Sequence, residues 1–159
     1  MSYIWVGFDR EISPQLIIEV LKNKFMVSNC YEFSLENFSK LQNELNFKII
    51  DEDTKKVFYE TIKNDSEFPI IWEFTFFSHF KDDIKAGLYL AHCFSKVLKC
   101  KTITDGSGFG DDNSPYWDVV FDEGKIFLVD DLETKFSGDG DKLLKVVKEL
   151  NIDFSRGSG

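Results

Sequence analysis

Two short runs of alternating apolar residues, separated by Glu123-Gly124, constrain the fold of this chain most strongly. Residues 116–121 and 125–130 have the β-branched and aromatic content of strands, and the glycine accepts the positive φ that a tight hairpin turn needs. A two-residue turn pairs Asp122 with Lys125, which sets the register of both strands. One face of the hairpin then carries the residues of a core, namely Trp117, Val119, Phe121, Ile126 and Leu128.

The opposite face of this predicted hairpin mixes apolar and acidic side chains. It carries Tyr116, Asp118, Val120, Asp122, Lys125, Phe127 and Val129. An apolar centre with a charged rim is the composition of a surface that a second protein covers. We therefore expect this face to be exposed and available to a partner.

Negative charge is concentrated around the same hairpin. Between Asp105 and Asp141 there are nine Asp and two Glu against two Lys, a net charge of −9 that equals the net charge of the whole 159-residue chain. Nucleic-acid binding is disfavoured, because phosphate contacts need Lys and Arg in quantity. An acidic surface favours a basic partner instead, mainly through faster encounter.

The rest of the chain predicts an α+β fold. Strands are expected over residues 3–8, 31–33, 47–50, 68–77 and 101–104, and helices over residues 14–25, 35–45, 53–62, 82–99 and 142–150. The helices follow from apolar residues at helical spacing, and Ser13-Pro14 and Asp82-Asp83 mark two of their starts. The helix over residues 82–99 has a basic outer row. We predict a mixed or mainly antiparallel sheet with a C-terminal hairpin, packed against four to five helices in one domain over residues 1–154.

Cysteine usage and the N-terminus favour a cytoplasmic location. Cys30, Cys93 and Cys100 are odd in number and have no CxxC spacing, which favours free thiols over disulfides or a zinc site. No apolar run approaches the roughly 18 residues that cross a bilayer.

The N-terminus lacks the basic segment and cleavage site of a signal peptide. The last five residues, 155–159, have the composition of a linker tail, and we expect no membrane contact.

The glycine-rich run Gly106-Ser-Gly-Phe-Gly110 is a weak candidate for a ligand loop. It lacks the GK[ST] ending of a phosphate loop, and Asp111-Asp112 follow it and would repel phosphate. As a calcium loop that starts at Asp105, it has Phe109 at position five and Tyr116 at position twelve, where a bidentate Glu is required. We interpret the run as a turn-rich connection and expect neither a metal nor another cofactor.

Asp118 followed by Glu133-Thr-Lys135 resembles the core of the PD-(D/E)xK nucleases. The resemblance implies two carboxylates that hold Mg²⁺ and a lysine that assists the attacking water. Pro115 is not adjacent to Asp118, however, and Glu133 lies beyond the end of the predicted strand. A Mg²⁺-dependent nuclease is kept as an alternative hypothesis, and a non-catalytic adaptor subunit as a third.

In size, acidity, aromatic content and lack of a catalytic set, the chain resembles the immunity proteins of bacterial toxin–immunity pairs. The residues that carry this resemblance are Asp105-Gly-Ser-Gly-Phe-Gly-Asp-Asp-Asn-Ser-Pro-Tyr-Trp-Asp118 and Phe121-Asp-Glu-Gly-Lys-Ile-Phe-Leu-Val-Asp-Asp-Leu-Glu133. The resemblance implies a cytoplasmic protein that binds and neutralises a basic toxin domain such as a nuclease. It leaves the oligomeric state open.

The predicted partner-binding residues lie in these two segments. The acidic ones, expected to face Lys and Arg of the partner, are Asp111, Asp112, Asp118, Asp122, Glu123, Asp130, Asp131 and Glu133. The aromatic ones, expected to anchor the complex, are Phe109, Tyr116 and Trp117, of which Trp117 is also a candidate core residue.

Overall fold

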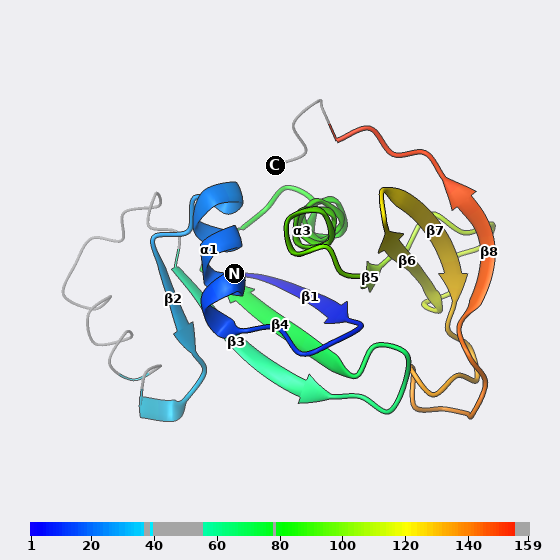
Figure 1. Cartoon of the computed structure of the whole chain (residues 1–159), viewed down its shortest axis with the longest axis horizontal. Coiled ribbons are helices and arrows are strands. Elements are labelled where there is room, and N and C mark those ends of the chain that lie inside the picture. The colour runs from blue at the N-terminus through cyan, green and yellow to red at the C-terminus, as the bar shows by residue number, and fades with distance from the viewer. Residues whose placement is uncertain (37–38, 40–55, 78, 155–159) are drawn as a thin grey trace.

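One curved sheet organises the described part of the chain, which comprises residues 1–36, 39, 56–77 and 79–154 of the computed structural model (Figure 1). Its eight strands lie in the order β2-β3-β4-β1-β5-β6-β7-β8. Only β2 and β3 are parallel neighbours, and the other pairs are antiparallel. The strands are β1 (Ser2–Phe8), β2 (Asn29–Glu32), β3 (Lys56–Lys63), β4 (Ile70–Phe76), β5 (Thr102–Asp105), β6 (Trp117–Asp122), β7 (Lys125–Asp130) and β8 (Lys145–Leu150).

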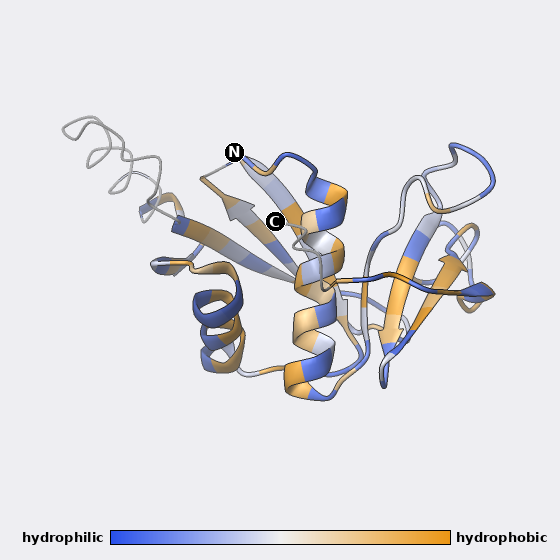
Figure 2. Ribbon diagram, turned by 90° about the horizontal axis from the view of Figure 1, so that it is seen from above, coloured by the Kyte–Doolittle hydropathy of each residue, from blue (hydrophilic) through white to orange (hydrophobic). Residues whose placement is uncertain are grey.

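Two helices, α1 (Pro14–Phe25) and α3 (Asp83–Leu98), pack on the side toward which the sheet curves (Figure 1). Both show alternating hydrophobic and hydrophilic bands, as expected for helices with one buried and one exposed face (Figure 2). The carboxylate of Asp82 accepts a hydrogen bond of 3.1 Å from the Lys85 amide and so caps the start of α3. Neither of these two described helices has the length and apolar composition needed to cross a membrane.

The main core lies between the two helices and the inner face of the sheet. Ile70, Trp72, Phe74 and Phe76 of β4 are all buried, which confirms the predicted core face of this strand. The Phe74 ring stacks on Phe94 of α3, with 5.9 Å between ring centroids and an interplanar angle of 19°. This contact fixes the helix against the centre of the sheet.

The predicted hairpin register is confirmed. Asp122 pairs with Lys125, and Val119 pairs with Leu128, around a turn in which Gly124 has a φ of 82°. The face assigned to the core is buried in the main core, with Trp117, Val119, Phe121, Ile126 and Leu128. A two-residue turn leaves no freedom in the pairing, which is why this local prediction succeeds.

The opposite face of the hairpin is covered by the chain itself, so the prediction that it is open to a partner is wrong. Val120 and Val129 form a second buried cluster with Phe136, which lies in the segment of residues 131–144 that follows β7. The Phe136 ring lies 5.8 Å from Trp5 and 6.2 Å from Phe68, measured between ring centroids. This cluster buries apolar surface that would otherwise be exposed on the outer side of the sheet.

The prediction of four to five helices is wrong, because the described residues form only two. Residues 56–62, assigned to a helix, belong to β3, which pairs with β4 along its length and has the Val, Thr and aromatic content of a strand. Residues 145–150, also assigned to a helix, form β8, which completes the sheet beside β7. In both segments strand pairing with a neighbour overrides a helical spacing of apolar residues. The helix predicted over residues 35–45 lies largely, and the strand over residues 47–50 entirely, outside the described residues.

Candidate functional site

The end of the sheet where β5 stops, β6 starts and β7 stops gathers seven carboxylates that are exposed or half-buried. The register places Asp105 opposite Asp118 on the neighbouring strand. Burial, and then the charges of Asp130 and Asp139, raise the pKa of the Asp131 carboxyl group, which shows that these acidic groups are close together. We define this surface as the acidic end, and its members are Asp105, Asp111, Asp112, Asp130, Glu133, Asp139 and Asp141.

The acidic end combines carboxylates with exposed apolar side chains. Asp105 and Asp130 are half-buried, whereas the other five members are exposed. Glu133 forms an ion pair with Lys142, at 2.8 Å between Oε2 and Nζ. Leu132 and Leu143, which flank this pair in sequence, keep 44% and 68% of their surface exposed. The surface therefore offers both charge and apolar area to a partner.

Two predicted partner-binding acids, Asp118 and Asp131, are buried and cannot face a partner. Their exposed fractions are 2% and 8%, and each carboxyl group is close enough to shift the pKa of the other. Burial raises the pKa of Asp118 to about 11, with the neighbouring Asp131 carboxyl group as a further cause. Asp118 is therefore protonated at neutral pH, so the pair carries one charge instead of two.

The loop between β5 and β6 is held by its own hydrogen bonds. Oδ1 of Asp105 accepts from the amide and the hydroxyl of Ser107, at 2.8 and 2.6 Å. Oδ1 of Asp112 accepts from the indole Nε1–H of Trp117 at 2.8 Å, and the hydrogen bonds from the Ser114 amide and this indole lower the pKa of Asp112. The loop is thus a turn-rich connection whose acids are partly fixed in position.

The three aromatic side chains proposed as anchors are placed differently. Trp117 is 9% exposed and belongs to the main core, because it lies on the inner face of β6. Phe109 packs against the same core and is half-buried. Tyr116 is also half-buried, and its carbonyl accepts a hydrogen bond from the Asp131 amide at 2.9 Å. Phe109 and Tyr116 can present only part of their rings to a partner.

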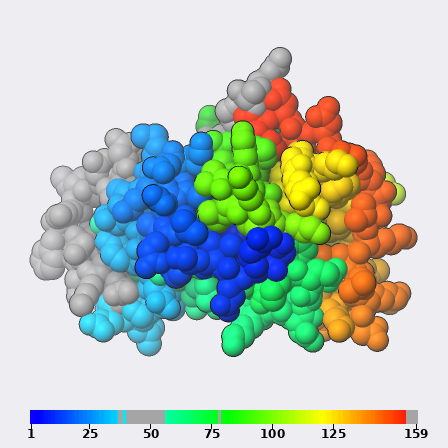
Figure 3. Space-filling model, viewed as in Figure 1, coloured from blue at the N-terminus to red at the C-terminus, as the bar shows by residue number. Residues whose placement is uncertain are grey.

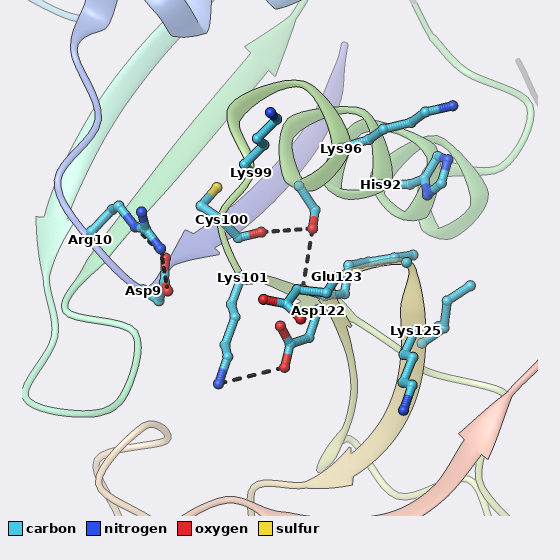
Figure 4. Close-up of a pocket in the computed structure, with 14 residues that line it drawn as sticks. Asp9, Arg10, His92, Lys96, Lys99, Cys100, Lys101, Asp122, Glu123 and Lys125 are labelled. Atoms are coloured by element: carbon cyan, nitrogen blue, oxygen red, sulfur yellow. Dashed lines mark hydrogen bonds and ion pairs between the residues drawn. The ribbon is translucent and has the colours of Figure 1, made fainter.

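Asp122 and Glu123, also predicted to face the partner, lie at the opposite end of the hairpin from the acidic end. They line a pocket of about 590 Å³. Its walls come from the connection between β1 and α1, the last turns of α3 with the residues that follow, and the hairpin turn (Figure 4). The space-filling view shows the same three parts of the chain meeting on one face, coloured dark blue, green and yellow (Figure 3).

This pocket is cationic in an otherwise acidic protein. It is lined by five basic side chains, Arg10, Lys96, Lys99, Lys101 and Lys125, and by three carboxylates, Asp9, Asp122 and Glu123. Arg10 is paired with Asp9 at 3.1 Å, and Lys101 with Asp122 at 3.6 Å. Within the described residues no ion pair involves the three other lysines. The net lining charge therefore favours an anion.

The residues of the nuclease hypothesis do not form a common site. Asp118 is buried against Asp131, whereas Glu133 is exposed and paired with Lys142. No group of three or more His, Cys, Asp or Glu side chains in the described part of the chain could hold a metal ion. The three cysteines are free thiols, and burial raises the pKa of Cys30 to about 12 and that of Cys100 to about 11. Such thiols are poor nucleophiles at neutral pH.

The basic residues of the pocket were not predicted as a site. Lys96 and Lys99 belong to the basic outer row of α3, which was recognised only as a helix face. The sequence feature that distinguishes Lys96 and Lys99 from the other residues of this row is their position in and just after the last turn of the helix. Arg10 and Lys125 are far from them in sequence, and only the fold brings all four together.

Comparison of the chain with protein-family models, with curated proteins and with solved structures finds no match. The candidate functions of the acidic end and of the pocket therefore rest on geometry, burial and charge.

Proposed function

We propose that this protein binds and neutralises a basic protein partner, specifically the nuclease domain of a toxin, through the acidic end. The observation that carries the proposal is the gathering of seven carboxylates from three separate chain segments at one end of the sheet. A nuclease needs cationic side chains to hold phosphates. A surface rich in carboxylates complements those side chains and competes with the nucleic acid for them.

Two further observations support a binding role for this surface. Leu132 and Leu143 supply exposed apolar area beside the carboxylates, and removing apolar area from water on binding stabilises a protein complex. The hydrogen bonds that hold the loop before β6 reduce the ordering that binding requires. The three free cysteines support a reducing compartment, so we place this activity in the cytoplasm.

The proposal predicts that a neighbouring reading frame encodes a protein with a basic C-terminal domain, and that domain serves as the partner in the test. Co-expression of this chain is expected to restore growth to a bacterial host that the domain inhibits, and the purified proteins are expected to form a complex. Absence of both growth rescue and a complex at micromolar concentrations would refute the proposal.

A pair of charge variants tests the surface itself. Asp111→Asn with Asp141→Asn removes two exposed carboxylates that have no hydrogen-bond partner in the described structure. The association rate constant is expected to fall about 3- to 10-fold at low salt and to become less dependent on ionic strength. The matched control is Glu11→Gln with Glu19→Gln, which removes two exposed carboxylates at and beside α1. Equal effects of both pairs would contradict the assignment of the acidic end.

A further inference from the structure

We propose that the cationic pocket at the C-terminal end of α3 binds a small organic anion, a phosphate monoester that carries a flat apolar group. This site lies at the other end of the hairpin from the acidic end and does not depend on the neutralising function proposed above. Its volume of about 590 Å³ falls within the range of about 300–1,000 Å³ that is typical of small-molecule sites.

The net positive charge of the side chains that line the pocket favours an anionic ligand. The pocket holds two more basic side chains than carboxylates, which matches the two negative charges of a phosphate monoester. Lys96 and Lys99 stand on one wall and Lys125 on another, with their amino groups directed outward from the rim of the pocket (Figure 4), and their summed positive charge attracts a phosphate group to its mouth. The two ion pairs in the lining hold Arg10 and Lys101 in place beside this cationic group.

The other side chains that line the pocket are the reason why we expect the ligand to carry a flat apolar group. Phe121, Ile126 and Cys100 contribute buried apolar side chains to the pocket. His92 completes this part, and its ring is stacked on Phe154 with 4.3 Å between centroids and an interplanar angle of 13°. Charged groups at the rim and apolar groups inside are the arrangement that fixes a ligand with one polar and one apolar end.

Hydrogen bonds connect parts of the fold that build the pocket. The hydroxyl of Ser95 donates a hydrogen bond of 2.7 Å to the Cys100 carbonyl and lies 3.4 Å from the Phe121 carbonyl. It therefore ties the end of α3 to both β6 and the segment before β5. The lysines project from this tied framework, so the backbone of the site is largely preformed.

Isothermal titration calorimetry with 1-naphthyl phosphate tests the proposal. We expect saturable 1:1 binding that is at least 10-fold tighter than that of 1-naphthol or of inorganic phosphate, because each lacks one of the two features. In a ¹H–¹⁵N NMR titration, the largest amide shifts are expected at Lys99, Gly124 and their neighbours. Absence of saturable binding, or shifts centred elsewhere on the protein, would overturn the proposal.

Two pairs of variants distinguish binding in the pocket from a general effect of the protein's charge on affinity. Lys96→Gln with Lys125→Gln removes two pocket lysines on different walls and is expected to raise Kd about 10-fold or more. Lys81→Gln with Lys85→Gln, at and just before the first turn of α3, makes the same charge change at two exposed residues outside the pocket and is expected to change Kd less than 2-fold. A similar loss of affinity in both pairs would show that the pocket is not the binding site.

Discussion

Asp118 and Asp131 are two adjacent buried carboxyl groups that lie beneath the acidic end. Asp118 lies on the outer side of β6, and Asp131 follows the last residue of β7, so the two carboxyl groups meet where the hairpin opens. Burial, and then the neighbouring Asp131 carboxyl group, raise the pKa of Asp118 to about 11. Protonation of Asp118 at neutral pH allows two adjacent acidic side chains to be buried with the charge of only one.

Replacement of Asp118 by Asn is expected to remove a pH dependence of the folding stability. The folded-state pKa of Asp118 is raised far above its ordinary value of 3.8, so the folded protein keeps a proton that the unfolded chain releases. This contribution to stability is fully present below about pH 4 and is lost as the pH rises toward the folded-state pKa. Between pH 5 and 7, the wild-type free energy of unfolding should fall relative to that of Asp118→Asn by about 1.4 kcal/mol per pH unit.

Urea denaturation of both proteins at several pH values measures this difference. Asp111→Asn is the control, because this exposed carboxylate has no hydrogen-bond partner in the described structure. A difference between wild type and Asp118→Asn that does not change with pH would mean that Asp118 is ionised in the folded protein.

Replacement of Phe136 by Ala tests whether residues 131–144 cover the outer face of the sheet. Phe136 is 8% exposed and contacts Trp5 and Phe68. Its truncation is expected to reduce the free energy of unfolding by about 3–4 kcal/mol, measured by urea denaturation, because it leaves a cavity. Val147→Ala, at a residue that is 45% exposed on β8, is the control and should change stability by less than about 0.5 kcal/mol. Equal effects would contradict the covering role of Phe136.

The parts of the fold that sequence predicts correctly are those that local chemistry determines. The turn at Glu123-Gly124 has a single pairing that places the apolar residues on one face, and the hairpin follows from it. Helix α3 follows from the cap at Asp82 and a long apolar row. The four alternating buried residues of β4 likewise identify its core face without knowledge of its neighbours.

The parts that sequence misses depend on contacts between distant segments. β8 has an apolar spacing that also fits a helix, and only its pairing with β7 decides the outcome. The outer face of the hairpin is buried because Phe136 packs with Val120 and Val129, which no local pattern indicates. Sequence therefore located the concentration of negative charge, but it could not separate the acids at one end of the hairpin from Asp122 and Glu123 at the other.

Replacement of Gly110 by Ala is expected to disturb the loop that carries Asp111 and Asp112. A Cβ atom at this position would overlap with the indole ring of Trp117, which is buried and cannot move away. The expected loss of stability is about 1–3 kcal/mol, with a change in tryptophan fluorescence. Gly108→Ala is the comparison, because a Cβ atom at Gly108 would meet open space. Only the positive φ of 92° would strain this alanine, and the expected loss of stability is about 1 kcal/mol. A smaller loss for Gly110→Ala than for Gly108→Ala would contradict the close packing of this loop on Trp117.

Replacement of Phe154 by Ala is expected to raise the pKa of His92. Burial, and then the charge of Lys96, lower this pKa below its ordinary value of 6.5, and the stacked Phe154 ring provides part of the burial. A His whose folded-state pKa is lowered contributes stability at pH values above the unfolded-state pKa of that His. This contribution is lost as the pH falls toward the folded-state pKa. In Phe154→Ala, the free energy of unfolding should therefore fall less between pH 7 and pH 5 than it does in the wild type.

An NMR titration of the His92 Hε1 resonance measures the pKa directly. Lys96→Gln should also raise it, because the charge of Lys96 is the second cause of the lowered pKa. Lys85→Gln, near the start of the same helix, serves as the control and should leave the titration of His92 unchanged. An unchanged midpoint in Phe154→Ala would mean that the stacked ring does not shield His92 from water.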